Sequence, residues 1–198
     1  MDKGADHTIE TLERPTGEVA ATLAAAFQND PALSWIMPDA ATRERMLPRF
    51  FAIMAEQSLR FGTVLTSRSR DTAALLYPAG EVKDDRLWDS LRLLAIFKAT
   101  LPRGLKVAEE MQKRHPHPQP LVYLRYIGVA PSAQGQGRGG AMLREIIAQA
   151  ANRGQGVLLE TATPDNVAIY SRLGFEIASK WEVPGGGPKF WTMIHPAP

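Results

Sequence analysis

One segment of the chain holds four glycines and one arginine within six residues, and these residue types can bind phosphate. Gly135, Gly137, Gly139 and Gly140 have no side chain, so the backbone can approach a ligand closely and adopt positive φ. Consecutive N–H groups ahead of a helix attract anions, and Arg138 adds a positive charge. The segment follows a strand-like stretch and precedes a helical one, which predicts a pyrophosphate site. A glycine-rich turn without a ligand is the alternative.

The spacing of the glycines excludes one nucleotide-binding motif and fits another. No Lys-Ser or Lys-Thr follows them, so a P-loop is excluded. Gly135, Gly137 and Gly140 match the dinucleotide motif Gly-x-Gly-x-x-Gly, and Glu160 follows after about twenty residues, as that motif requires. However, residues 131–134 separate the strand from the first glycine, and less than a third of the chain is left for the rest of such a domain. An NAD(P)-dependent oxidoreductase is therefore kept as an alternative function.

Two separate segments match motifs of one enzyme family. Residues 134–139 read Gln-x-x-Gly-x-Gly, and residues 166–175 read Asn-x-x-x-Tyr-x-Arg-Leu-Gly-Phe. With these motifs in this order, the sequence resembles the GNAT acetyltransferase superfamily. The resemblance implies an acyl-CoA N-acyltransferase fold, an acetyl-CoA-dependent acyltransferase activity with acetyl-CoA as the acyl-donor substrate, and no metal.

A looser likeness extends over most of the chain. Residues 23–27 before Asp30-Pro31, the segment 159–161 and the segment 191–193 resemble the puromycin N-acetyltransferase-like subgroup. This resemblance implies that acetyl is transferred to a primary amine of a small molecule. The acceptor would be an aminoacyl nucleoside or an antibiotic, and the role would be resistance.

The resemblance also implies where acetyl-CoA binds. The thioester would lie in a splay between the strand that ends at Val129 and the strand that ends near Thr161. Backbone groups of Ile127 and Val129 would pair with the pantetheine arm, Asn166 would contact it, and the N–H of Val129 would stabilise the oxyanion. The implied acetyl-CoA-binding residues are Ile127, Gly128, Val129, Gln134, Gly135, Gln136, Gly137, Arg138, Gly139, Gly140, Asn166 and Tyr170.

Two side chains are candidates for proton transfer, and the absence of cysteine favours direct transfer of the acetyl group. Tyr170 is the expected general acid for the departing CoA thiolate, because a neutral phenol has a proton to donate. Glu160 is the candidate general base; an equal alternative is that it positions the substrate ammonium or forms a salt bridge. A weak base is enough for an α-amine, whose pKa is ~8, whereas a lysine-like amine has a pKa of ~10.4.

These residues need a scaffold, and the hydrophobic patterns predict one. We expect strands at residues 8–14, 63–66, 72–77, 121–129, 157–161, 175–183 and 188–194, and helices at 16–27, 41–61, 83–114, 137–152 and 165–173. Residues 102–104, Pro-Arg-Gly, are expected to break the third of these helices. The fold class is α+β (mixed α/β), with a central mixed sheet of about seven strands flanked by helices. The expected single domain spans 1–198 and includes a helical, Pro-rich acceptor-side segment, 83–120.

Composition limits what else the chain could be. The absence of cysteine excludes a disulfide scaffold, a Cys-rich zinc site and a cysteine nucleophile. The net charge of +2 and the scattered basic residues do not indicate nucleic-acid binding. No apolar run approaches the ~18 residues of a membrane-spanning helix. The first residues lack the apolar core of a secretory signal, so we expect a cytoplasmic protein.

A few expectations concern partners and single residues. His115 and His117 form a His-x-His pair, but the prolines around them and the missing third ligand indicate no metal site. Arg125 is unusual on a central strand; it could reach solvent, pair with an acid or face substrate. The expected partners are acetyl-CoA and a small-molecule amine, with no nucleic acid and no membrane, and the chain is expected to be a monomer or homodimer. A non-catalytic acyl-CoA-binding regulator is the second alternative function.

Overall fold

The computed structural model describes residues 8–14, 16–78, 87–114 and 120–198. Helices and strands alternate along the chain, as the hydrophobic patterns predict. In chain order the elements are β1 (Ile9–Leu12), α1 (Gly17–Ala26), α2 (Pro31–Ile36), α3 (Ala40–Phe61), β2 (Thr63–Ser67), β3 (Thr72–Tyr77), α4 (Leu87–Phe97), the 3₁₀ turn Lys98–Thr100, α5 (Leu101–Arg114), β4 (Leu121–Val129), the 3₁₀ turn Pro131–Ala133, α6 (Arg138–Ala151), β5 (Gly156–Thr161), α7 (Pro164–Ser171), β6 (Glu176–Glu182) and β7 (Lys189–His195).

The strands form one seven-stranded sheet in the order β1-β2-β3-β4-β5-β7-β6. β4 and β5 are parallel, and every other neighbouring pair is antiparallel. The expected α+β class and the mixed sheet of about seven strands are therefore confirmed. A dinucleotide-binding domain needs an open sheet that is mostly parallel, so the oxidoreductase alternative is wrong.

The parallel pairing of β4 with β5 covers only half of β4. It begins at Leu121 and ends at Leu124, which pairs with Leu159. β4 continues to pair with β3 as far as Val129, although a β-bulge interrupts the register and leaves Arg125 as the extra residue. A bulge bends its strand and increases the local twist. The edge of β4 that faces β5 is consequently unpaired from Arg125 onwards, and this opening is the splay that the GNAT resemblance implies.

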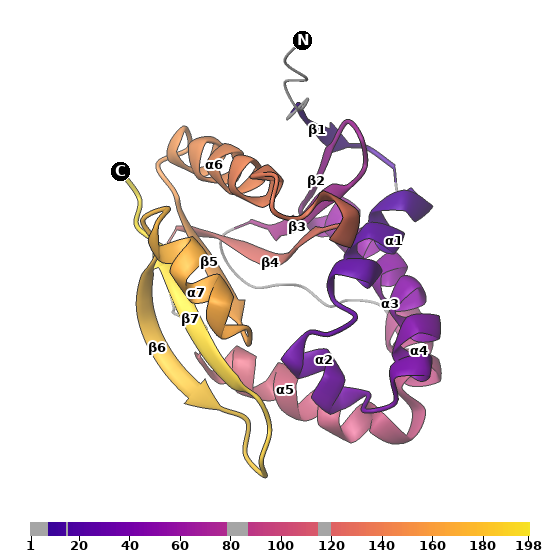
Figure 1. Ribbon diagram of the computed structural model, residues 1–198. Coiled ribbons are helices and arrows are strands. Elements are labelled where there is room, and N and C mark those ends of the chain that lie inside the picture. Colours follow the sequence, from indigo (N-terminus) through magenta and orange to yellow (C-terminus); the bar gives the residue numbers. More distant parts are fainter. Residues whose placement is uncertain (1–7, 15, 79–86, 115–119) are drawn as a thin grey trace.

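Helices cover both faces of the sheet (Figure 1). On one face α1 and α3 bury Leu23 and Phe51, and this core continues to Trp181 on β6. On the other face α6 and α7 bury Met142 and Tyr170. Side chains alternate between the two faces along each strand. A ligand in the splay would therefore lie between two layers that different helices build.

Two helical predictions need correction. No helix is predicted between residues 27 and 41, but Asp30 and Pro31 start α2 there. The carboxylate of Asp30 accepts a hydrogen bond from the N–H of Leu33 at 2.9 Å and caps α2, with Pro31 in its first turn. The expected break at residues 102–104 is also wrong: it falls earlier, at Lys98–Thr100, and Pro102 lies in the first turn of α5. Proline is tolerated there because the first N–H groups of a helix have no partner.

A helix that crosses a bilayer must be both long and apolar. No helix within residues 8–14, 16–78, 87–114 and 120–198 meets both requirements.

Candidate active site

The glycine-rich loop leaves a row of backbone donors at the start of α6. Gly135 and Gly137 both have a φ of +75°, and Gly137 is the residue before the helix. A Cβ at either position would meet no atom within 4 Å, so the space beside both glycines is open. Within the described residues, the backbone N–H groups from Gly135 to Gly140 donate no hydrogen bond to the protein. These donors, together with the positive end of α6, fit a diphosphate.

The side chains of the same loop serve to hold its shape. Gln134 donates from Nε2 to the carbonyl oxygen of Val129 at 3.1 Å, and Gln136 donates to the carbonyl of Ser132 at 3.2 Å. Both amides thus bond to the residues where the chain leaves β4. In this structure the two glutamines fasten the loop to the strand end, which sequence reasoning did not foresee.

Arg138 pairs with an acid of the β2–β3 turn. Its Nη1 lies 2.6 Å from Oδ2 of Asp71 and 3.0 Å from Oγ of Ser69. Partial burial of Asp71 acts in the opposite direction, but hydrogen bonds from Ser69, Ser67 and Thr72 and the charge of Arg138 hold the pKa of Asp71 below its ordinary value. The positive charge that the sequence assigns to phosphate binding is therefore partly neutralised. Direct contact of Arg138 with the cofactor stays a prediction.

The free edge of β4 presents backbone groups to the splay. The N–H of Ala130 donates to the carbonyl of Asp71, next to β3, at 2.7 Å. Because backbone hydrogen-bonding groups alternate in direction along a strand, the N–H groups of Val129 and Ile127 point away from β3. They lie where the resemblance places the pantetheine arm. Gly128 between them faces α1, where a Cβ would lie 2.7 Å from Cβ of Ala26, so packing already explains the glycine at this position.

Tyr170 approaches the splay from the α6 and α7 face. Its ring packs against Phe175 at 5.7 Å between centroids, and its side chain is only 7% exposed. Burial, followed by the negative charge of Asp30, raises the pKa of Tyr170 to about 12. The phenol is therefore protonated at neutral pH. Asn166 lies one turn earlier on α7 with a half-buried side chain, so both residues share one side of the helix.

Glu160 approaches from the opposite face of the sheet. Its neighbour Leu159 packs with the α6 and α7 layer, so the carboxylate of Glu160 points to the other side. Tyr123 donates a hydrogen bond to Oε2 at 3.1 Å, and within the described residues the buried Oε1 has no partner. Burial raises the pKa of Glu160 to about 7, against the opposing effects of the Tyr123 hydrogen bond and the positive charge of Arg114. This is the range that suits a general base near neutral pH.

Asp30 is a site residue that sequence reasoning did not assign. Burial raises the pKa of its carboxyl, although backbone N–H groups of Leu33 and Ala32 oppose the shift. Its charge in turn contributes to raising the pKa values of Tyr126 on β4 and Tyr170 on α7. The charge of the residue that caps α2 thus acts on tyrosines of both β4 and α7. The sequence signal for it was the pair Asp30-Pro31, a frequent start of a helix.

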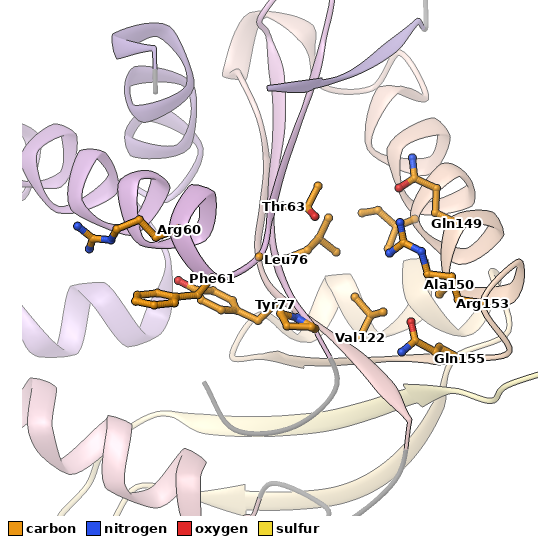
Figure 2. Close-up of a pocket in the computed structure, with 13 residues that line it drawn as sticks. Arg60, Phe61, Thr63, Leu76, Tyr77, Val122, Gln149, Ala150, Arg153 and Gln155 are labelled. Carbon is orange, nitrogen blue, oxygen red and sulfur yellow. The ribbon is translucent and has the colours of Figure 1, made fainter. Parts of the chain in front are cut away.

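A groove of about 370 Å³ opens at the other end of β3 and β4 (Figure 2). Gln149 and Arg153 approach it from the end of α6, and Thr63 and Leu76 approach it from the sheet. None of the predicted site residues lines it. His115 and His117 lie outside the described residues, so the structure does not test their expected lack of a metal.

The comparisons with known proteins agree with this architecture. Residues 104–177 match the family model described as acetyltransferase (GNAT) domain. A solved structure from Corynebacterium glutamicum, described as histone acetyltransferase HPA2 and related acetyltransferase, is 25% identical with a TM-score of 0.71, and the match covers 96% of each chain. Arylalkylamine N-acetyltransferase 2 from Aedes aegypti is 14% identical with a TM-score of 0.62, covering 94% of this chain and 97% of the other.

A third structure extends the same fold to another enzyme. Polyamine N-acetyltransferase from Drosophila melanogaster is 18% identical with a TM-score of 0.54, and the match covers 94% of this chain and 99% of that one. The matched domain and the shared fold together support a GNAT acetyltransferase domain and an enzyme of the acyltransferase class. The likeness to the puromycin N-acetyltransferase subgroup stays a prediction.

Proposed function

We propose that this chain, an acyltransferase with a GNAT acetyltransferase domain, transfers acetyl from acetyl-CoA directly to the primary amine of a small molecule. One observation carries the proposal. The pairing of β4 with β5 ends at Leu124, and the edge opened there leads to the free N–H groups of the glycine loop. A thioester in this opening would have Glu160 on one face of the sheet and Tyr170 on the other.

Acetyl-CoA would be held mainly by backbone groups. The loop from Gly135 to Gly140 and the N-terminus of α6 would bind the pyrophosphate, and the N–H groups of Ile127 and Val129 would pair with the pantetheine arm. The same N–H of Val129 would stabilise the oxyanion that develops on the thioester carbonyl. Asn166 would contact the arm from α7.

The two titratable side chains divide the proton transfers between the two faces. Glu160 takes a proton from the acceptor ammonium, so that the neutral nitrogen can attack the carbonyl carbon. A C–N bond forms, the C–S bond breaks, Tyr170 gives its proton to the CoA thiolate, and the new amide nitrogen releases its second proton to solvent. Each residue is then reset from solvent: Tyr170 regains a proton and Glu160 loses one. A base with a pKa near 7 is half ionised at neutral pH, which suits an α-amine better than a lysine-like amine.

The identity of the acceptor amine has to be determined by activity assays. The similar structures include an arylalkylamine and a polyamine N-acetyltransferase by name, and the subgroup resemblance implies an aminoacyl nucleoside or antibiotic. We therefore infer a small primary amine and rank puromycin with aryl amines, polyamines and amino acids as acceptors to be assayed.

The test measures release of free CoA from acetyl-CoA across that panel with a thiol reagent, which the absence of native cysteine keeps free of background. The expected result is release with at least one amine and its loss in Glu160→Gln. Acetyl-CoA, but not NAD(P), should raise the melting temperature, because a ligand stabilises only the fold that binds it. Stabilisation by acetyl-CoA without release from any amine would instead support the non-catalytic regulator. The absence of both effects would contradict the proposal.

A further inference from the structure

Arg125 lies at the bulge of β4, one residue beyond the last pair with β5. Its guanidinium stacks between two tyrosines, 5.5 Å from the ring centroid of Tyr77 and 5.7 Å from that of Tyr126. Nη1 donates to the hydroxyl of Tyr77 at 3.4 Å, a long hydrogen bond. The side chain is half-buried. The charged group is thus fixed in position at the mouth of the splay.

Two other shielded arginines of the described residues have strong protein acceptors. Arg43 is 7% exposed and donates to the carbonyl oxygens of Gln28, Met37 and Pro38. Arg138 pairs with the carboxylate of Asp71. Each of these two guanidiniums has acceptors that repay its desolvation.

Arg125 differs from both of them. Across the ranges that the structure describes, it forms no ion pair with any carboxylate, and its polar partners are the neutral hydroxyls of Tyr77 and Tyr126. A shielded cation without an anion is costly for the fold, and a guanidinium presents a planar set of donors that matches carboxylate and phosphate. The unpaired charge therefore indicates an anion supplied from outside the chain.

Arg125 lies on the side of the sheet where the acceptor amine would meet Glu160. Its neighbour two residues earlier, Tyr123, donates to Glu160 from the face that carries the candidate base. Tyr77 belongs to the same buried cluster as Tyr123, so Arg125 and Glu160 lie on the same side of the sheet. The donor cradle, in contrast, is beyond Val129 at the glycine loop. An acceptor whose amine meets Glu160 would therefore have other groups within the neighbourhood of Arg125.

We propose that Arg125 binds an anionic group, a carboxylate or a phosphate, of the acceptor molecule. This inference rests on the proposed function and narrows its substrate class to amines that also carry a negative charge. Glu160 would then take the proton from the amine, and Arg125 would orient the other end of the molecule.

The experiment compares acceptors that differ only in the anion. L-Phenylalanine against phenethylamine tests a carboxylate, O-phosphoethanolamine against ethanolamine tests a phosphate, and puromycin is an amine with neither group. Acetyl transfer is measured as CoA release, and binding is measured by calorimetry on the CoA-saturated protein. The variants are Arg125→Gln and Arg125→Lys, and the matched control is Arg153→Gln, an exposed arginine at the other end of the sheet. Melting temperatures verify that each variant is folded.

The expected result is that the anionic member of one pair has a kcat/KM about 10- to 100-fold above its neutral partner, the range for losing a charge-assisted hydrogen bond. Arg125→Gln should abolish that ratio, Arg125→Lys should keep part of it, and Arg153→Gln should leave it unchanged. A purely structural Arg125 would lower all rates together and leave the ratio intact, which would overturn the inference. Equal or better use of phenethylamine, ethanolamine or puromycin by the wild type would overturn it as well.

The two proposals fail in distinguishable ways. Binding of an anionic amine that depends on Arg125, without acetyl transfer, would support this inference and contradict the proposed function. Transfer to neutral amines alone would do the opposite. If no probe is bound or acetylated in an Arg125-dependent way, the inference is wrong.

Discussion

The proposed donor end and the proposed acceptor end of the splay present different kinds of chemical groups. At the proposed donor end, the available groups are backbone N–H groups of the glycine-rich loop 135–140, and the nearby arginine is paired with Asp71. At the acceptor end, the groups are side chains: the carboxylate of Glu160 with one unpartnered oxygen, and the guanidinium of Arg125 without a carboxylate.

This difference separates a general means of binding diphosphate from the groups that select one substrate. A backbone cradle binds a diphosphate whatever the rest of the ligand, so one loop can serve many enzymes that share a donor. Shielded charges select by complementarity, because each needs an opposite charge or a proton at the right place. Changes at the acceptor end should therefore alter chemistry and choice of substrate, whereas changes at the donor end should alter affinity for acetyl-CoA.

The largest expected effect is that of Glu160→Gln on turnover. A general base contributes about 100- to 10,000-fold, so kcat should fall by that order while the KM for acetyl-CoA changes little. In the wild type kcat/KM should rise with pH through about 7, because the ionised carboxylate is the active form, and this limb should vanish in the variant. Steady-state pH profiles measure both effects. Glu176→Gln, an exposed carboxylate on β6, is the control, and an unchanged acidic limb in Glu160→Gln would contradict the role of base.

The same substitution should make the protein more stable. The pKa of Glu160 is raised to about 7 in the fold, so the folded state holds this proton more tightly than the unfolded chain, where the pKa is ~4.3. Stability is therefore lost as pH rises from about 4.5 through 7, by up to about 3 kcal/mol. Gln mimics the protonated form and should not show this loss.

Denaturant melts at two pH values check the linkage. Glu160→Gln should exceed the wild type at pH 8 and equal it near pH 4, whereas Glu176→Gln should track the wild type at both. If Glu160 is the base and its ionised form destabilises the fold, Glu160→Gln should show both this gain in stability and the loss of turnover. Equal stability at pH 8 would mean that the carboxylate is not destabilised by its surroundings.

The place of the glycine-rich loop between a strand and a helix could be predicted from the sequence, because the information is local. The glycines lie within six residues, directly between a strand and a helix, so their backbone geometry follows from one short motif. The sheet could also be predicted from the sequence, since β4 and β5 are strongly apolar strands. What could not be read was the end of their pairing at Leu124 and the bulge at Arg125, because both depend on partner strands far along the chain.

The acceptor end was only partly predictable, because its contacts join distant segments. Glu160 was named as a candidate base, but its partner Tyr123 is 37 residues away in sequence. Asp30 was not assigned as a site residue, and its carboxylate caps α2, a helix that the sequence analysis did not predict. Arg125 stood out by type, but its stacking between Tyr77 and Tyr126 could not be predicted, because Tyr77 lies on another strand.

Tyr170→Phe tests the acid on the other face, with a smaller expected effect. The variant keeps the ring that packs on Phe175 and removes only the proton. A thiolate with a pKa of ~8.5 is already a fair leaving group, so kcat should fall by about 100-fold, the lower limit for general acids. Tyr123→Phe is the matched control: it removes a hydroxyl that bonds Glu160 and should shift the acidic limb of the pH profile instead. Wild-type turnover in Tyr170→Phe would leave Tyr170 as a packing residue.

The smallest expected effect lies at the donor end, in the ion pair of Arg138 with Asp71. If the pair only fixes the loop, Arg138→Gln and Asp71→Asn should each raise the KM for acetyl-CoA about 2- to 5-fold, the worth of a partly exposed ion pair. The double variant should then be no worse than the weaker single variant, because both remove one interaction. If Arg138 binds the pyrophosphate itself, Arg138→Gln should cost more than tenfold while Asp71→Asn frees the cation and tightens binding. The sign of the Asp71→Asn effect therefore decides whether the donor end relies on its backbone alone.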